Sequence, residues 1–310
     1  MKRRDFFKSA AIVGIASFFK TNALGSVLSG KEMAVHSQPD LVAVMGGEPA
    51  AMLVRALKEL GGIGHFVKRG QKVVIKPNIG WDKSPELGAN TNPELIGELV
   101  KLCKGAGASE VIVFDHSCQD WKKCYANSGI EKAVLAAGGK MVPANDESYY
   151  REVEFPRGVN LKNAKVHQSL LECDVWFNVP VLKDHGGAKN TISMKNLMGI
   201  VWDRGYFHSH DLHQCIADAA TFHKKPALNI VDAYRIIKSN GPQGKSESDV
   251  VKLKSLLVSP DYVAVDTAAI KLYSQVRPTD LKDVRYIELA EKNRVGTQHL
   301  EKLNVKRIKM

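Results

Sequence analysis

Residues 181–203, which read VLKDHGGAKNTISMKNLMGIVWD, combine the side chains best suited to chemistry in this chain of 310 residues. Lys183, His185 and Lys195 lie in this stretch, directly after the apolar run Val175–Val181. A buried strand that opens into a basic, glycine-rich loop is where α/β proteins place ligands. We therefore expect Lys183, His185 and Lys195 to be the catalytic residues.

The two lysines indicate a small anionic ligand. Ammonium groups that converge favour a carboxylate or a phosphate. They also lower each other's pKa, which can leave a neutral amine able to act as a base or to form a Schiff base. His185, beside two glycines, is the candidate acid or base. The alternative for each lysine is an ordinary place on the surface.

Other polar side chains lie just after the ends of expected strands, and one lies next to Lys195 in the sequence. In an open parallel sheet the carboxyl ends of the strands line one rim, so these side chains should converge on the same pocket. An Asp at such a junction is equally typical of a helix cap or a turn. The residues that we expect to bind the substrate are Lys76, Asn78, Asp115 and Asn196.

Metal binding at the same rim is left open. The segment 208–213 is the densest histidine cluster, and two of its histidines would lie one helical turn apart if Asp211 opens a helix. The alternative is that these histidines face solvent at a helix start. Two aspartates, one after a strand and one in a helix, could supply carboxylates. The candidate metal ligands are Asp232, Asp266, His208, His210 and His213.

The five cysteines contain no CxxC pair, and no spacing matches a zinc site or an iron–sulfur motif. The cofactor therefore stays unknown. Cys118 and Cys124 could form a disulfide in an oxidising compartment, or they could be separate thiols.

Residues 1–34 are expected to be an export signal and linker. The run KRRDFFK at 2–8 precedes a mildly apolar stretch and small residues suited to cleavage. Its paired arginines, phenylalanine and lysine resemble a twin-arginine signal, which would make the twin-arginine machinery a partner. An ordinary secretory signal, or a basic helix that stays in place, is the alternative. We expect a mature protein that is periplasmic or otherwise exported, with no stable membrane anchor.

The net charge of +11 at first indicates a nucleic-acid partner. The first twenty residues contribute five basic side chains and one acidic side chain, so 11 − 4 leaves +7 for the rest. This remainder is spread along the chain, without an arginine-rich run. Nucleic-acid binding is therefore not expected.

Strands alternate with helices along the chain, which predicts an α/β fold with a mostly parallel sheet and helices on both faces. Nothing forces a boundary within residues 35–310, so a single α/β domain is expected there. The expected strands are 40–44, 72–75, 110–114, 140–142, 150–155, 175–181, 229–231, 255–258 and 305–308. The expected helices are 49–60, 92–106, 130–137, 211–222, 261–273 and 286–293.

With these residues laid out, the chain resembles the family called domain of unknown function 362 from about residue 40 to about residue 300. Its most specific part is a Lys-x-His motif at 183–185 followed by Lys-Asn-x-x-Gly at 195–199. The resemblance implies no settled reaction. Many relatives carry a cysteine-rich ferredoxin-like segment that this chain lacks. The family-typical positions that it implies are Lys76, Lys183, His185, Lys195, Asn196, Asp232 and Asp266.

These observations lead to three hypotheses. The first is an exported enzyme that acts on a small anionic substrate, with a metal or cofactor left open. The second is a non-catalytic periplasmic protein that binds a ligand or a metal at the same rim. The third is an accessory factor for exported redox enzymes, which would need a partner protein.

Overall fold

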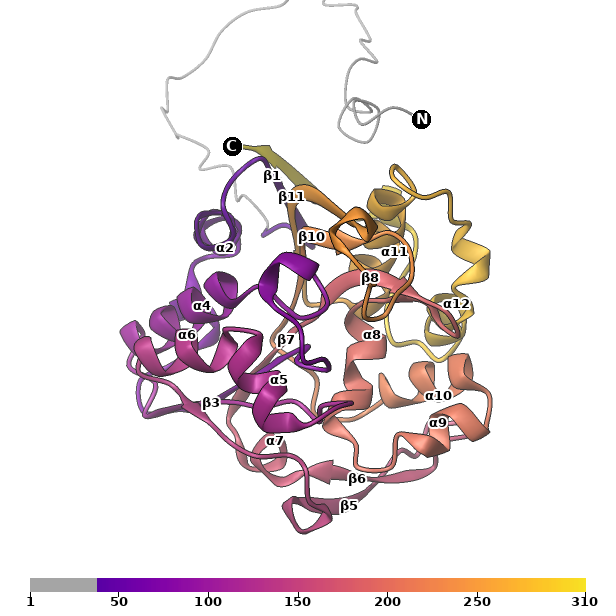
Figure 1. Cartoon of the computed structure of the whole chain (residues 1–310), viewed down its shortest axis with the longest axis horizontal. Helices are drawn as coiled ribbons and strands as arrows, with labels where there is room; N and C mark the ends of the chain where they lie inside the picture. Colours follow the sequence, from indigo (N-terminus) through magenta and orange to yellow (C-terminus); the bar gives the residue numbers. More distant parts are fainter. Residues whose placement is uncertain (1–37) are drawn as a thin grey trace, which may run out of the picture.

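The computed structural model describes residues 38–310 (Figure 1). The predicted export signal and linker, residues 1–34, lies outside this part of the chain. Between residues 38 and 310, no helix is both long enough and apolar enough to cross a bilayer.

The central sheet has the strand order β12-β1-β11-β10-β7-β2-β3-β4, with β8 paired to β10 and β9 paired to β8. Its neighbours are mostly parallel, and the antiparallel pairs are β1–β11, β10–β11 and β8–β9. The predicted mostly parallel α/β fold is confirmed. The strands are β1 (Leu41–Met45), β2 (Lys72–Pro77), β3 (Glu110–Val113), β4 (Lys140–Met141), β7 (Val175–Val179), β8 (Val181–His185), β9 (Lys189–Thr191), β10 (Leu228–Ile237), β11 (Val250–Ser259) and β12 (Val305–Lys309).

Helices cover both faces of this sheet because the buried strands are apolar on both sides. In β2, Val73 and Ile75 join one hydrophobic core and Val74 joins the other, as the two-residue period of a strand requires. Helices α2, α4, α5 and α6 pack on the first core, and α8, α10, α11 and α12 on the second (Figure 1). The helices are α2 (Pro49–Glu59), α3 (Ile63–Phe66), α4 (Pro93–Gly105), α5 (Trp121–Asn127), α6 (Ile130–Ala136), α7 (Gln168–Glu172), α8 (Ser193–Asn196), α9 (Gly205–Ser209), α10 (Leu212–Ala219), α11 (Tyr262–Tyr273) and α12 (Arg285–Lys292).

The basic segment after β7 is more regular than the sequence predicts. Instead of a flexible loop it forms the antiparallel β8–β9 hairpin, then α8 and the 3-10 helix η3 (Leu197–Ile200). Lys183 pairs with Thr191 in the hairpin register, and His185 pairs with Lys189. The catalytic candidates therefore stand on paired backbone, which holds them more firmly than a loop would.

Three further differences from the predicted elements concern strand and helix limits. The strand predicted at 150–155 does not join the main sheet: β5 (Tyr150–Glu154) pairs with β6 (Asn163–His167) in a two-stranded sheet. Strand β10 continues through Asp232, which the sequence placed at a strand end. Helix α10 ends at Ala219, before the expected limit at 222, and Asp211 is its cap because its carboxylate accepts from the backbone N–H groups of His213 and Gln214.

Candidate functional site

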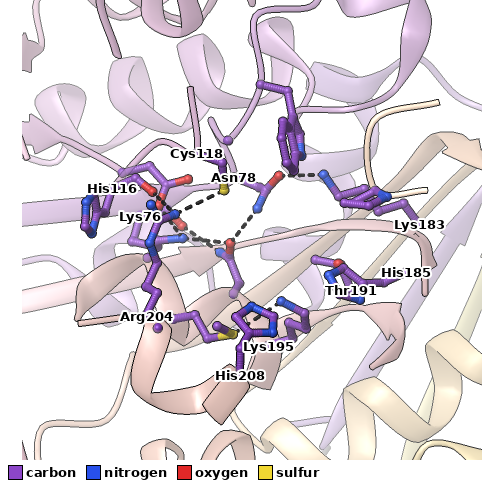
Figure 2. A pocket seen from close by; sticks show the side chains of 18 residues that line it. Lys76, Asn78, His116, Cys118, Lys183, His185, Thr191, Lys195, Arg204 and His208 are labelled. Atoms are coloured by element: carbon purple, nitrogen blue, oxygen red, sulfur yellow. Dashed lines mark hydrogen bonds and ion pairs between the residues drawn. The ribbon is translucent and has the colours of Figure 1, made fainter. Parts of the chain in front are cut away.

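A cavity of about 410 Å³ opens where the carboxyl ends of β2 and β3 meet the β8–β9 hairpin, α8 and the start of α9 (Figure 2). This size suits a small molecule. All seven of the predicted catalytic and substrate-binding residues line it, and the structure therefore brings them together. They are Lys76, Asn78, Asp115, Lys183, His185, Lys195 and Asn196.

Lys76 and Asp115 form a buried ion pair in the lining of the cavity. The Lys76 Nζ atom lies 2.8 Å from Asp115 Oδ1 and 2.7 Å from Asn196 Oδ1. The other carboxylate oxygen of Asp115 accepts from the backbone N–H of Ile79 at 2.6 Å. Burial lowers the pKa of Lys76, and the charge of Asp115 opposes that shift. Both charges are thus satisfied within the protein, so this pair supports the pocket instead of reaching for a ligand.

A chain of side-chain amides links this pair to Lys183. Asn78 donates to Asn196 Oδ1 at 3.2 Å, and its own Oδ1 accepts from Lys183 Nζ at 2.9 Å. Lys183 also donates to the carbonyl oxygen of Ala89. Asn178 of β7, which the sequence analysis did not assign to the site, accepts from Asn196 Nδ2 at 2.9 Å and fixes its orientation. A polar residue inside an otherwise apolar strand was the available signal.

Lys183 and Lys195 differ in their hydrogen-bond partners. Lys183 is 1% exposed and donates to two oxygen acceptors, whereas the Nζ atom of Lys195 has the thioether sulfur of Met198 as its contact, at 3.3 Å. Among residues 38–310, neither lysine forms an ion pair with a carboxylate. The amine of Lys195 is therefore held by fewer and weaker hydrogen bonds than that of Lys183.

Burial and neighbouring cations lower the pKa of both lysines. For Lys183 burial is the main cause, the Cys118 thiol opposes it, Lys195 and Lys76 add to it, and the pKa falls to about 7. For Lys195 burial again comes first, Arg204 and Lys76 add to it, and the pKa falls to about 8. Near neutral pH both amines can therefore gain or lose a proton.

His185 is half-buried and has a defined backbone partner. The backbone N–H of Ala188 donates to His185 Nδ1 at 3.1 Å. Burial and the charges of Lys195 and Lys183 lower the pKa of His185 to about 2. The imidazole in the pocket is therefore neutral at physiological pH.

Arg204 and Cys118 also line the cavity, and the sequence reasoning did not assign either to the site. Arg204 donates to the carbonyl oxygens of His116 and Ser117 at 2.8 and 2.9 Å, and its Nη1 atom lies 3.1 Å from Cys118 Sγ (Figure 2). The turn after η3 brings Arg204 back to the loop after β3. This position depends on the fold, and no sequence motif marks it. Cys118 lies just past an expected strand end, which was the available signal.

The cysteines are free thiols, so the structure contains no disulfide between Cys118 and Cys124. Cys118 is exposed, whereas the other four are buried. Those four are Cys103, Cys124, Cys173 and Cys215.

The two aspartates predicted as metal ligands are buried, and their carboxylates accept hydrogen bonds from backbone N–H groups. Asp232 accepts from the N–H groups of Asn92 and Tyr234 at 2.8 and 2.9 Å. Asp266 caps α8, accepting from the N–H groups of Ser193 and Met194 at 2.9 and 3.1 Å. Burial raises the pKa of Asp266 to about 7, which those donors oppose. These carboxylates position the elements around the pocket and do not line it.

The three predicted histidine ligands are also separate. His208 lines the cavity, His210 stacks on Tyr206 with ring centroids 3.8 Å apart, and His213 accepts from the backbone N–H of Tyr286. Within residues 38–310, no group of three or more His, Cys, Asp or Glu side chains is placed to hold a metal ion. The structure therefore does not bring the five predicted metal ligands together.

The pocket is rich in cations and its acceptors are already engaged. Its charged lining is Lys76, Lys183, Lys195 and Arg204 against Asp115, so four cations minus one anion give +3 when the lysines are protonated. Asn78 Oδ1, Asn196 Oδ1 and Asp115 Oδ2 accept hydrogen bonds from protein donors, and Asp115 Oδ1 lies in the ion pair with Lys76. This lining favours a ligand that supplies negative charge and lone pairs.

Among proteins of known sequence, the Thylakoid-associated protein sll1697 of Synechocystis sp. is 26% identical over 231 residues, which cover 71% of this chain and 68% of that protein. Two solved structures are also similar to this chain. The lactate racemase apoprotein from Thermoanaerobacterium thermosaccharolyticum has a TM-score of 0.47 at 14% identity. The alignment covers 77% of this chain, which spans 58% of that protein. A protein from Thermotoga maritima has a TM-score of 0.46 at 12% identity, over 79% of this chain and 60% of its own.

Residues 73–271 match the family described as Domain of unknown function (DUF362). The match spans more than half of the chain and includes every predicted catalytic and substrate-binding residue. It supports the resemblance drawn from the Lys-x-His and Lys-Asn-x-x-Gly motifs. The chain belongs to the DUF362 family.

Proposed function

We propose that this protein is an enzyme that acts on a small anion, such as a carboxylate or a phosphate, bound in the pocket. The observation that carries the proposal is the excess of cationic donors over acceptors that are still free. Asp115 neutralises Lys76, while Lys183, Lys195 and Arg204 have no carboxylate partner in the described part of the chain. Buried cations without counterions favour an anionic ligand, which would supply the missing charge.

The two key lysines have different proposed roles. Lys183, tied to Asn78 and Ala89, is held in place and binds the anion as a positioned cation. Lys195 has only a thioether contact, and its pKa of about 8 leaves a minor fraction as the free amine at neutral pH. Lys183 has the lower pKa, about 7, but its amine is held by two oxygen acceptors, so the hydrogen-bond partners distinguish the two roles. A free amine can accept a proton or attack an electrophilic carbon. This property of Lys195 favours an enzyme over a protein that only binds its ligand.

The proposed place of action is outside the cytoplasm. The support is the twin-arginine-like run at 2–8. A binding protein or an accessory factor in the same compartment would share this feature, so Lys195 is what separates the proposals.

Cys118 gives a direct test of anion binding. It lines the pocket and is the exposed cysteine, so a thiol reagent should modify it first in the native protein. We expect inorganic phosphate or acetate to slow this modification in a saturable way, because a bound anion would cover the thiol. Peptide mass spectrometry would confirm that Cys118 is the modified residue.

Two variants make that test specific. Lys183→Met should lose the protection, since it removes the positioned cation. Lys101→Met, which changes a lysine whose side chain is 75% exposed on α4, should keep it. If no anion protects Cys118 in the unaltered protein, or if both variants behave alike, the anion pocket is refuted.

A second measurement separates catalysis from simple binding. Glyoxylate is a small anionic aldehyde: an amine attacks its carbonyl carbon, water leaves, and cyanoborohydride reduces the resulting imine to a stable amine. At neutral pH we expect Lys195 to be labelled ahead of the exposed lysines, and Lys195→Arg to abolish that label. Labelling spread evenly over surface lysines would favour a binding protein.

A further inference from the structure

His185 is placed to contact whatever the lysines bind. It follows Lys183 by two residues on β8, so both side chains project from the same face of the strand. Both line the cavity, with Lys195 on its α8 side (Figure 2). A group at this position has the substrate as its neighbour.

The backbone determines which nitrogen of His185 carries the hydrogen. Ala188 N–H donates to Nδ1 at 3.1 Å, so Nδ1 uses its lone pair as an acceptor. In a neutral imidazole the hydrogen must then be on Nε2. A flipped ring would present carbon to the Ala188 N–H and lose that hydrogen bond, so only one ring orientation fits.

The surroundings of His185 keep the ring uncharged. The titratable groups that face it are Lys183 on β8, Lys195 on α8, His208 on α9 and His213 on α10. Each of them disfavours a second positive charge, and burial acts in the same direction. With Nδ1 occupied and protonation disfavoured, His185 has a hydrogen to give and no free lone pair to accept one.

We propose that His185 is a fixed neutral hydrogen-bond donor whose Nε2–H binds an oxygen of the anionic substrate, and that Lys195 is the group of the site that takes up a proton. This replaces the acid or base role that the sequence suggests for His185. The contact to substrate rests on the proposed function, whereas the position of the hydrogen does not. The recognised oxygen must offer a lone pair, as carboxylate, phosphate and carbonyl oxygens do.

Nitrogen NMR of protein labelled at its ten histidines tests the hydrogen position without any ligand. The signals of His185 are assigned by their loss in His185→Gln. We expect the Nε2–H tautomer, with signals that remain those of a neutral imidazole from about pH 6 to about pH 9. The Nδ1–H tautomer, or a titration within this range, would overturn the proposal.

Sulfate affinity, measured by calorimetry, tests the contact. His185→Gln keeps a donor and should bind sulfate within about threefold of the unaltered protein, while His185→Leu should bind about tenfold more weakly at every pH. If His185→Leu instead changes the shape of the pH profile, His185 titrates and the proposal is wrong. If the unaltered protein binds neither sulfate nor phosphate, the proposed function fails, and the nitrogen signals still decide the protonation of His185.

Discussion

Lys183 and Lys195 illustrate how two identical side chains acquire different uses. Both are drawn from their ordinary pKa by burial and by nearby cations. Lys183 donates hydrogen bonds to the oxygens of Asn78 and Ala89. The amine of Lys195 contacts only the thioether sulfur of Met198, which is a weak acceptor. A fixed cation suits binding, and a loosely held amine suits proton transfer or attack on carbon.

The pH dependence of anion binding follows from these two amines. Below about pH 7 both are protonated and affinity for sulfate should be highest. As the pH rises through about 7 and then about 8, first Lys183 and then Lys195 loses its charge, so affinity should fall. Because a bound anion favours the charged forms, it raises both pKa values, so in saturating sulfate both lysines should lose their protons at higher pH.

Lys195→Arg provides the control for this profile. Its guanidinium stays charged over the whole range, so the fall assigned to Lys195 should disappear while the one assigned to Lys183 remains. Calorimetric titration with sulfate, whose own charge is constant near neutral pH, measures both. An affinity that does not change between about pH 6 and about pH 9 would contradict the assignment.

The lysines of the site could be predicted because they follow apolar strands in the sequence, and strand ends meet at one rim. The roles of the individual side chains could not be predicted in the same way. Asp115 was expected to bind substrate, but it forms an ion pair with Lys76, and that pairing depends on β2 and β3 being neighbours in the sheet, which no local sequence pattern shows. Arg204 could not be found at all, because its place depends on a turn that no sequence motif marks.

At the scale of elements, the 3-10 helix η3 packs its backbone directly against the buried ion pair. A Cβ atom added at Gly199 would overlap Asp115 Oδ1 and Lys76 Nζ. We therefore expect Gly199→Ala to break this ion pair and to lower the free energy of unfolding by about 3 kcal/mol, since a broken buried pair leaves charges uncompensated. Urea denaturation measures the change.

Gly105→Ala is the matched control. Gly105 is the last residue of α4, and a Cβ atom there meets nothing within 4 Å. Its stability should be unchanged or up to about 1 kcal/mol higher, because alanine favours helix. A Gly199→Ala protein as stable as the unaltered one, with the same sulfate affinity, would show that the base of the pocket is not rigid.

The elements predicted best were those with local signals. Helix α4 begins as expected at Asn92 and Pro93, with the Asn92 side chain accepting from Glu94 N–H. The β8–β9 hairpin was missed because its strands carry polar side chains that face the pocket, which hides the apolar alternation of a strand. The polar side chains that line the pocket thus hid the sequence pattern of the two strands that carry them.

At the scale of the whole molecule, the export prediction concerns residues that the structure does not describe. We expect residues 1–34 to carry a folded reporter protein out of the cytoplasm of a bacterial host, and a variant with Arg3→Lys and Arg4→Lys to leave it inside. Cell fractionation measures the distribution. Export of both versions, or export in a host without the twin-arginine machinery, would contradict the prediction.

The contacts that build the pocket join distant parts of the chain. Lys76 meets Asn196 across 120 residues, Lys183 meets Asn78 across 105, and Lys183 meets Ala89 across 94. While the polypeptide is still emerging from the ribosome, β2 and β3 must wait for segments that have not yet been translated. A truncated product that stops before α8 lacks Lys195 and Asn196, so we expect it not to bind the proposed anion, and anion binding would report that the chain has been translated and folded at least through α8.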